Sequence, residues 1–170
     1  MSYEKTVWAG EGTLAREQEY NDHWCYERGI ITKAWLDVYA ATGDRRFYDA
    51  AKANVDQYVT ADGEILTYEP DKYNLDMICM GRTALRLFKA TGEAKYEKAC
   101  RRLIEQIKGQ PTTAEGGFWH KKLYPQQMWL DGIYMACPFL TEFAVTFGEM
   151  QWADLAAKQM TLIFDKTRLE

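Results

Sequence analysis

Several residue types and patterns that mark common functional classes are scarce or missing in this chain of 170 residues. It has only two histidines and four cysteines, and no CxxC pair, so neither a metal site nor a disulfide scaffold is predicted. The net charge is −4 and no basic block occurs, which disfavours nucleic acid as a partner. No apolar run approaches the roughly 20 residues of a membrane helix, so no membrane partner is expected.

Targeting and cofactor motifs are missing as well. The start of the chain, Met1-Ser-Tyr-Glu-Lys, lacks the apolar stretch of a signal peptide, so we expect a cytoplasmic protein. No P-loop, GxSxG motif or dinucleotide fingerprint occurs, and no cofactor is expected. Without cysteine pairing, four thiols are predicted to be free and packed as small apolar groups: Cys25, Cys79, Cys100 and Cys137.

Aromatic residues, by contrast, are plentiful. They make up 14% of the chain, with six Trp and eleven Tyr, and apolar residues in total reach 47%. The apolar content predicts a folded core in a single domain over residues 1–170. Flat aromatic rings suit stacking on sugars, but they equally suit a well-filled helical core. Composition alone leaves both interpretations open.

Helical periodicity predicts three helical hairpins, at about residues 26–58, 75–107 and 128–164. A glycine marks the tight turn of each hairpin: Gly43, Gly92 and Gly148. The first helix of each hairpin is the more apolar, and the second carries a solvated face, which indicates an inner and an outer ring. The predicted fold is therefore all-α, an α/α toroid of helical hairpins.

Local signals refine this prediction. Asp44 suits the N-cap of the helix after the first turn, and Pro138 predicts a kink or break in the fifth helix. Residues 65–68 are interpreted as a possible short strand. The expected helices span about 26–42, 45–58, 75–89, 94–107, 128–146 and 152–164.

Asp131 is the first candidate for chemistry, because it lies in an apolar segment beside Trp129 and Leu130. A carboxylate in such surroundings must be paired, hydrogen-bonded or functional. The alternative is an Asp that satisfies backbone N–H groups at its own helix start. Gly132 favours function, because glycine within a helix costs about 1 kcal/mol relative to alanine and leaves room for a ligand.

Asp76 repeats this situation one hairpin earlier, at the start of another apolar helix. If the inner helices lie side by side, Asp76 and Asp131 face one cavity, and their pKa values are pushed apart. One carboxyl could then act as an acid while the other stays ionised. Two independent N-cap aspartates remain the alternative at this point.

Two histidines and several aromatic residues complete the candidates. His120, flanked by Trp119 and Lys121, is interpreted as a ligand-binding residue or as one hydrogen-bonded within its own loop. His23 is interpreted as structural. The aromatic residues near the loops are candidates for sugar stacking: Trp24, Tyr26, Trp119, Trp129 and Tyr134.

These segments together resemble glycoside hydrolase family 105, the unsaturated rhamnogalacturonyl hydrolases, which are related to the unsaturated glucuronyl hydrolases. The specific part is Gly117-Phe-Trp-His-Lys-Lys followed by Tyr124-Pro-Gln-Gln-Met-Trp-Leu-Asp-Gly-Ile-Tyr-Met-Ala and Pro138-Phe-Leu. The match extends back through Asn74-Leu-Asp-Met and Trp24-Cys-Tyr-Glu-Arg-Gly. It covers about residues 24–150.

The resemblance implies a six-hairpin α/α barrel that acts on a sugar with a C4–C5 double bond. Enzymes of this family protonate C4 and add water at C5. Asp131 matches their general acid/base, and Asp76 matches the second aspartate. His120 and Trp129 match pocket residues around the unsaturated ring. Lys121 is expected to reach the adjoining sugar.

Length separates this chain from the family it resembles. Members of that family are about twice as long, so this sequence corresponds to about half of a barrel, the N-terminal half. Such a half would expose its apolar inner helices. We therefore expect either a homodimer that completes the barrel or a chain truncated from a larger enzyme. The alternative functions are a carbohydrate-binding module without turnover and a purely structural helical repeat.

Overall fold

The computed structural model describes residues 3–16 and 22–168, and their regular structure is helical throughout. No strand occurs in these residues, only isolated antiparallel bridges at Val59–Ile65 and Thr112–Phe118. The predicted all-α fold is confirmed. The helices are α1 (Tyr3–Ala15), α2 (Tyr26–Thr42), α3 (Arg45–Asp56), α4 (Gly81–Thr91), α5 (Ala94–Gly109), α6 (Leu130–Phe147) and α7 (Gln151–Thr167), with short 3₁₀ turns at η2 (Pro70–Lys72) and η3 (Leu75–Ile78).

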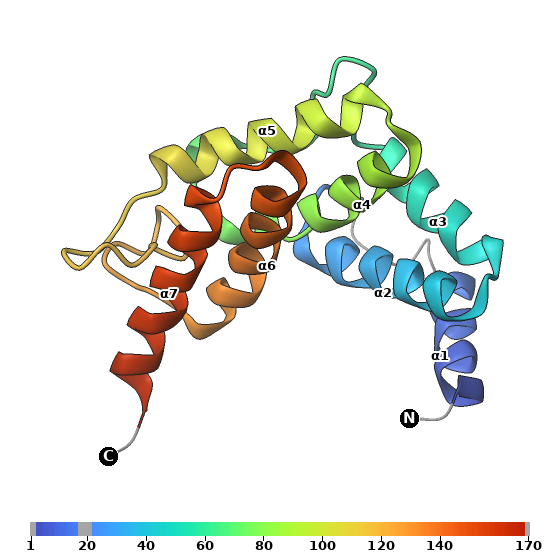
Figure 1. The fold of residues 1–170 in the computed structure, drawn as a ribbon, viewed down its shortest axis with the longest axis horizontal. Helices are drawn as coiled ribbons and strands as arrows, with labels where there is room; N and C mark the ends of the chain where they lie inside the picture. Colours follow the sequence, from blue (N-terminus) through green and yellow to red (C-terminus); the bar gives the residue numbers. More distant parts are fainter. Residues whose placement is uncertain (1–2, 17–21, 169–170) are drawn as a thin grey trace.

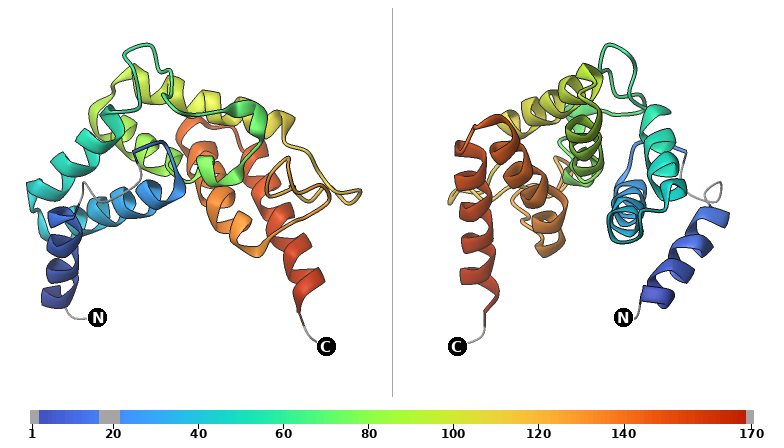
Figure 2. Two further views of the ribbon diagram at one scale, coloured as in Figure 1. Left: turned by 180° about the vertical axis from the view of Figure 1, so that it is seen from behind. Right: turned by 45° about the vertical axis from the view of Figure 1, so that its right-hand side comes forward.

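Three antiparallel hairpins form an arch. Helix α2 packs against α3, α4 against α5, and α6 against α7, while α4 also contacts both α2 and α6. Helices α2, α4 and α6 thus form one row, and α3, α5 and α7 lie outside it. Figures 1 and 2 show that the two termini lie at the opposite feet of the arch. This is the arrangement of a partial α/α toroid.

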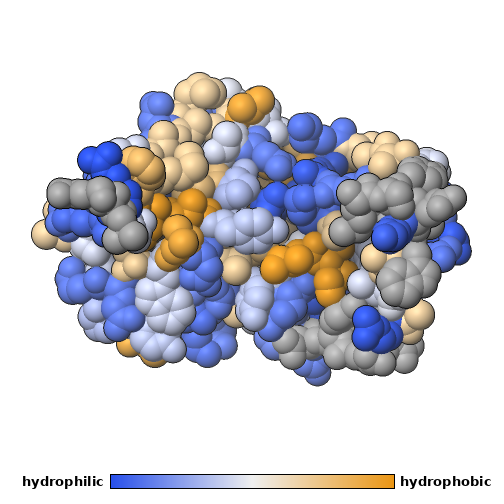
Figure 3. Space-filling view, turned by 90° about the horizontal axis from the view of Figure 1, so that it is seen from below, coloured by the Kyte–Doolittle hydropathy of each residue, from blue (hydrophilic) through white to orange (hydrophobic). Residues whose placement is uncertain are grey.

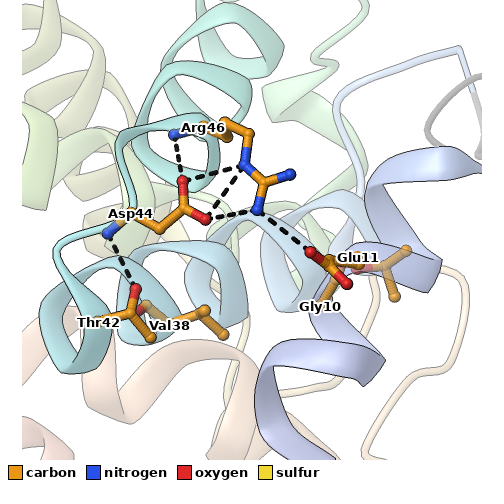
Figure 4. A network of polar contacts seen from close by, with 7 residues as sticks. Gly10, Glu11, Val38, Thr42, Asp44 and Arg46 are labelled. Atoms are coloured by element: carbon orange, nitrogen blue, oxygen red, sulfur yellow. Dashed lines mark hydrogen bonds and ion pairs between the residues drawn. The ribbon is translucent and has the colours of Figure 1, made fainter. Parts of the chain in front are cut away.

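The tight turns follow the sequence prediction closely. Gly43, Gly92 and Gly148 all follow a helix end with φ of 73°, 70° and 72°, the left-handed region that glycine adopts without a Cβ clash. The Asp44 carboxylate accepts a hydrogen bond from the Arg46 N–H and so caps α3 as predicted. The Arg46 guanidinium also bridges Asp44 and Glu11, which ties α1 to this turn (Figure 4).

The core lies between the two rows of helices. Its largest fully buried side chains include Trp24, Trp35, Phe139 and Phe143. Burying a side chain of this size stabilises the fold by roughly 1.5–3 kcal/mol. The aromatic content therefore serves the core to a large extent, and Trp24, which is 0% exposed, is not a sugar-stacking residue as its position near a loop suggested.

All four cysteines are buried free thiols, as predicted. Burial raises the pKa of Cys25, Cys79 and Cys137 to about 11, because a thiolate is poorly stabilised away from water. It raises the pKa of Cys100 as well. These thiols are therefore protonated and unreactive in the folded protein.

Four local expectations need correction. The helix predicted at 75–89 is two pieces, η3 and α4, because Asn74 caps a tight 3₁₀ turn through the Asp76 N–H. The strand interpretation of 65–68 is wrong, since only the bridge at Ile65 forms. Helix α6 continues through Pro138 without a break, and α1 was not predicted at all.

One face of the last hairpin carries exposed apolar side chains. They lie on α6 and α7, and are Leu130, Tyr134, Val145, Met160 and Phe164. Figure 3 shows the underside of the arch, where apolar side chains gather in separate areas among hydrophilic ones. Among the described residues, no helix combines the length and the apolarity that crossing a membrane requires.

Candidate active site

Asp76 occupies the first turn of η3, where the backbone is held by its own neighbours. The Asn74 side-chain oxygen accepts a hydrogen bond from the Asp76 N–H at 3.0 Å. The preceding N–H, that of Leu75, donates to the His120 carbonyl at 3.0 Å and so pairs with the second loop of the site. Two loops that are 45 residues apart in sequence are therefore joined at the residues that carry their functional groups.

The Asp76 carboxylate is buried and fully paired. Its Oδ1 lies 3.1 Å from His120 Nε2, and its Oδ2 lies 2.6 Å from Lys121 Nζ. Burial alone would raise the pKa of this carboxyl, but the hydrogen bonds and charges of His120 and Lys121 outweigh it and hold the pKa below its usual range. Asp76 is thus the ionised carboxylate of the site. The alternative of an independent N-cap aspartate is wrong for Asp76.

His120 lies at the centre of the site with 1% of its side chain exposed. Its backbone N–H donates to the Gln127 carbonyl at 2.8 Å, so its own loop fixes the main chain while Asp76 fixes the ring. The ring stacks on Trp129, with centroids 4.4 Å apart and planes 8° from parallel. Nδ1 has no hydrogen-bond partner among the described residues.

Gly132 explains how the His120 ring fits. A Cβ at this position would lie 3.1 Å from His120 Nδ1 and 3.2 Å from Leu75 Cδ1. The glycine therefore makes room for the imidazole of the protein itself. Our interpretation that it leaves room for a ligand is wrong.

Asp131 lies in the first turn of α6, and its Oδ2 is 4.0 Å from His120 Nε2. The two aspartates are therefore neighbours, as predicted, with ligand atoms within 4.8 Å of each other. Its side chain is 54% exposed, however, so our expectation that apolar neighbours bury Asp131 is wrong. The apolar side chains next to it in sequence point elsewhere or are themselves exposed, as Leu130 is.

The other predicted ligand-binding residues surround this cluster. The Lys121 ammonium is engaged with Asp76, and its reach toward an adjoining sugar stays a prediction. Trp129 is 36% exposed and also stacks on Tyr124, with centroids 4.9 Å apart. Tyr26 begins α2; the negative charge of Glu27 is the main cause of its raised pKa, and that of Asp76 contributes.

His23 stays outside this cluster, in keeping with its structural interpretation. Its Nδ1 lies 3.8 Å from Asp22 Oδ1.

Asp76, His120 and Asp131 each offer a ligand atom within 4.8 Å of the others, a spacing that a metal ion could use. The Lys121 ammonium already neutralises Asp76, and we assign no metal to the site.

A groove of about 520 Å³ runs along α6, with Met160 of α7 also lining it. Its lining is mostly apolar and includes Leu130, Ile133 and Tyr134. Tyr134 in turn lies under the Arg82 guanidinium, 5.3 Å from ring centroid to Cζ. Arg82 is buried, and its Nε and Nη1 find no hydrogen-bond partner in the described residues.

Three buried polar residues were not predicted: Arg82, Gln106 on α5, and Gln110 directly after α5. A signal for the glutamines was present, because they continue the buried stripe of Leu103 and Ile107 at helical spacing. A polar residue on a buried face must have partners. No comparable sequence signal marks Arg82, which lies one turn before Arg86 in the same helix.

Comparisons with known proteins now define the class. The model of Glycosyl Hydrolase Family 88 matches residues 5–169, so the chain belongs to this glycoside hydrolase family. A glycoside hydrolase of family 105 from C. acetobutylicum ATCC 824 superposes with a TM-score of 0.86 at 35% identity. A possible family 105 member from Klebsiella pneumoniae subsp. pneumoniae MGH 78578 superposes with a TM-score of 0.72 at 21% identity, which shows the shared fold.

The predicted resemblance, including its restriction to part of the barrel, is therefore confirmed. The match to the C. acetobutylicum protein covers 95% of this chain but 44% of that one. The match to the Klebsiella protein covers 84% of this chain and 36% of that one. This chain spans less than half the length of either solved relative.

Proposed function

We propose that this chain carries the acid/base site of a glycoside hydrolase that releases a 4,5-unsaturated uronic acid from lyase-generated oligosaccharides. The proposal rests on one observation. The carboxylates of Asp76 and Asp131 converge on His120 Nε2, at 3.1 and 4.0 Å. Family membership and the stacked Trp129 wall support the same chemistry.

The spacing disfavours inverting displacement by water at the anomeric carbon. Oxygen atoms of the two carboxylates lie within 4.8 Å of each other, whereas an inverting glycosidase holds its carboxyls roughly 6.5–9.5 Å apart to admit a water. Asp76 is also a poor nucleophile, because Lys121 and His120 already occupy both its oxygens. Delivery of a proton by the exposed Asp131 carboxyl fits this arrangement better.

In the proposed reaction, Asp131 donates a proton to C4, and positive charge develops at C5 and on the ring oxygen. Water adds at C5 and returns its proton to Asp131, so the acid is regenerated. The resulting hemiketal opens and releases the neighbouring sugar. Asp76 and His120 orient the ring for this proton transfer.

The remaining residues are assigned to binding. Trp129 is assigned to stacking on the uronate, and Tyr26, the first residue of α2, is assigned to binding by the resemblance. Lys121 acts through Asp76. We propose rhamnose as the sugar next to the uronate, because the resemblance to family 105 favours it, and this would make the substrate a pectin fragment.

The test follows the ultraviolet absorbance of the conjugated uronate after lyase-generated disaccharide is added to the chain. We expect absorbance to fall, and Asp131→Asn to abolish this loss while the helical circular dichroism stays intact. The matched control is Asp154→Asn, because Asp154 is an exposed aspartate in the first turn of α7, as Asp131 is in α6. Unaltered turnover in Asp131→Asn contradicts the assignment.

A second candidate is a carbohydrate-binding module without turnover. It is favoured by the exposure of Asp131 and by the 44% coverage of the C. acetobutylicum relative. Saturable disaccharide binding without any change of absorbance would support this candidate over the hydrolase.

A further inference from the structure

Two buried glutamines lie directly behind the site, one turn apart at the end of α5. Gln106 is 3% exposed and Gln110 is 6% exposed. A buried amide costs free energy unless its donors and acceptors find partners, so the partners of these two side chains reveal their task. Apart from the Tyr68 hydroxyl, each hydrogen-bond partner is either a backbone carbonyl of the loops that carry Asp76 and His120 or the amide of the other glutamine.

Gln110 bridges the two loops. Its Nε2 donates one hydrogen bond to the Tyr73 carbonyl at 2.9 Å and one to the Trp119 carbonyl at 2.8 Å. Tyr73 lies three residues before Asp76, and Trp119 directly precedes His120. One amide nitrogen therefore holds the backbones leading to both members of the buried pair.

Gln106 fixes the orientation of that amide. Its Nε2 donates to the Gln110 Oε1 at 3.1 Å and to the Asn74 carbonyl at 3.2 Å. Its own Oε1 accepts a hydrogen bond from the Tyr68 hydroxyl at 2.7 Å. All four amide N–H donors and both amide oxygens are used, so a flipped amide would set oxygen against carbonyl oxygen.

The loops need such support because they are not regular structure. Tyr73 has φ of 45°, a left-handed conformation that is strained for a residue with a Cβ. The backbones of the loops are linked directly by the hydrogen bonds from Leu75 N–H to the His120 carbonyl and from Lys122 N–H to the Lys72 carbonyl. The glutamines add three carbonyl contacts to these links.

We propose that Gln106 and Gln110 are positioning residues that set the Asp76–His120 distance from behind the site. Their catalytic consequence rests on the proposed function, but the geometric effect does not. The chain also supplies a matched comparison. Gln159 of α7 is equally buried and holds the same loop, accepting from the Phe118 N–H at 2.8 Å and donating to the Gly116 carbonyl at 2.9 Å, without contacting the Asp76 segment.

The experiment compares Gln110→Met with Gln159→Met in the full chain. The first readout is nuclear magnetic resonance of the His120 Nε2 proton and the Asp76 carboxyl carbon. In Gln110→Met we expect the slowly exchanging Nε2–H resonance to be lost and the pKa of Asp76 to move up toward its usual range. In Gln159→Met both signals should match those of the unaltered chain, although both variants lose buried hydrogen bonds.

The second readout is turnover of the unsaturated disaccharide. Misplacement by an ångström can cost about a hundredfold in rate, so Gln110→Met should lower kcat about tenfold or more with KM changed less than about twofold. If the unaltered chain shows no turnover, the proposed function fails, while the resonance comparison still decides the positioning role.

Three results would overturn the proposal. One is an unchanged His120 resonance in folded Gln110→Met, and another is the same loss of signal in Gln159→Met. If Gln110→Met does not fold, the milder Tyr68→Phe decides, because it only removes the hydroxyl that orients Gln106. An unchanged His120 resonance in Tyr68→Phe then refutes the inference.

Discussion

Substituting Gly132 by alanine tests how tightly the centre of the site is packed. Glycine within a helix is less favourable than alanine by about 1 kcal/mol, so the substitution would normally stabilise α6. Here the new Cβ would lie 3.1 Å from His120 Nδ1 and 3.2 Å from Leu75 Cδ1, closer than the roughly 3.5–4.0 Å optimum for such contacts. The imidazole must therefore move by a few tenths of an ångström.

The ring has little space in which to move. Trp129 stacks on it at 4.4 Å, and Asp76 holds Nε2 at 3.1 Å. Overpacking of this kind typically costs about 1–3 kcal/mol, so the net effect of Gly132→Ala should be a destabilisation between zero and about 2 kcal/mol. A weakened bond to Asp76 should also lower turnover about tenfold if the proposed acid/base chemistry is correct.

Urea unfolding followed by circular dichroism measures the stability, and the absorbance assay measures turnover. The control is Gly12→Ala in α1, where a Cβ would meet no heavy atom within 4 Å and stability should not fall. A Gly132→Ala protein that is stabilised by about 1 kcal/mol, with its His120 resonance unchanged, would refute the packing argument.

Three further predictions concern charge, stacking and assembly. Because the pKa of Asp76 is lowered in the folded state, its ionised form stabilises the fold above the unfolded-state pKa of about 3.9, and this contribution is lost as pH falls through the lower folded value. Lys121→Met should therefore lower the free energy of unfolding more at neutral pH than in acid, as measured by urea unfolding at the two pH values. An equal loss of stability at the two pH values would contradict the pairing of Lys121 with Asp76. Trp129→Ala should weaken disaccharide binding up to about tenfold, since an aromatic pair contributes about 0.5–1.5 kcal/mol. Titration calorimetry measures the affinity, and an undiminished affinity would show that Trp129 does not bind the sugar. The predicted homodimer should appear in light scattering as mass that rises with concentration, and Phe164→Lys should reduce it; a monomer at every concentration contradicts the pairing.

The hairpins were predictable because their signals are local. A glycine in the left-handed region ends each first helix, and Asp44 caps the helix after the first turn, so neighbouring residues suffice to place these turns. Helix α1 gave no such signal, since Gly10 and Gly12 disfavour a helix. Gly10 is explained only by the fold, because a Cβ there would lie 2.8 Å from the Phe47 ring.

The site divides in the same way. The apolar surroundings of Asp131 in sequence predicted burial, but its exposure depends on how α6 is covered, and no local pattern encodes that. The pairing of Asp76 with Lys121 joins loops that only the tertiary fold brings together. The Gln110 bridge has the same origin, because its partners lie 37 and 9 residues away.

The buried thiols can report where the folded structure opens. A thiol reagent reacts only with an accessible thiolate, so it modifies a given cysteine no faster than the surrounding structure comes apart. Cys25 precedes α2, Cys100 lies on α5, and Cys137 lies on α6, which gives each hairpin a separate reporter. Variants that retain one cysteine at a time would then show whether one terminal hairpin unfolds first or all three hairpins unfold together.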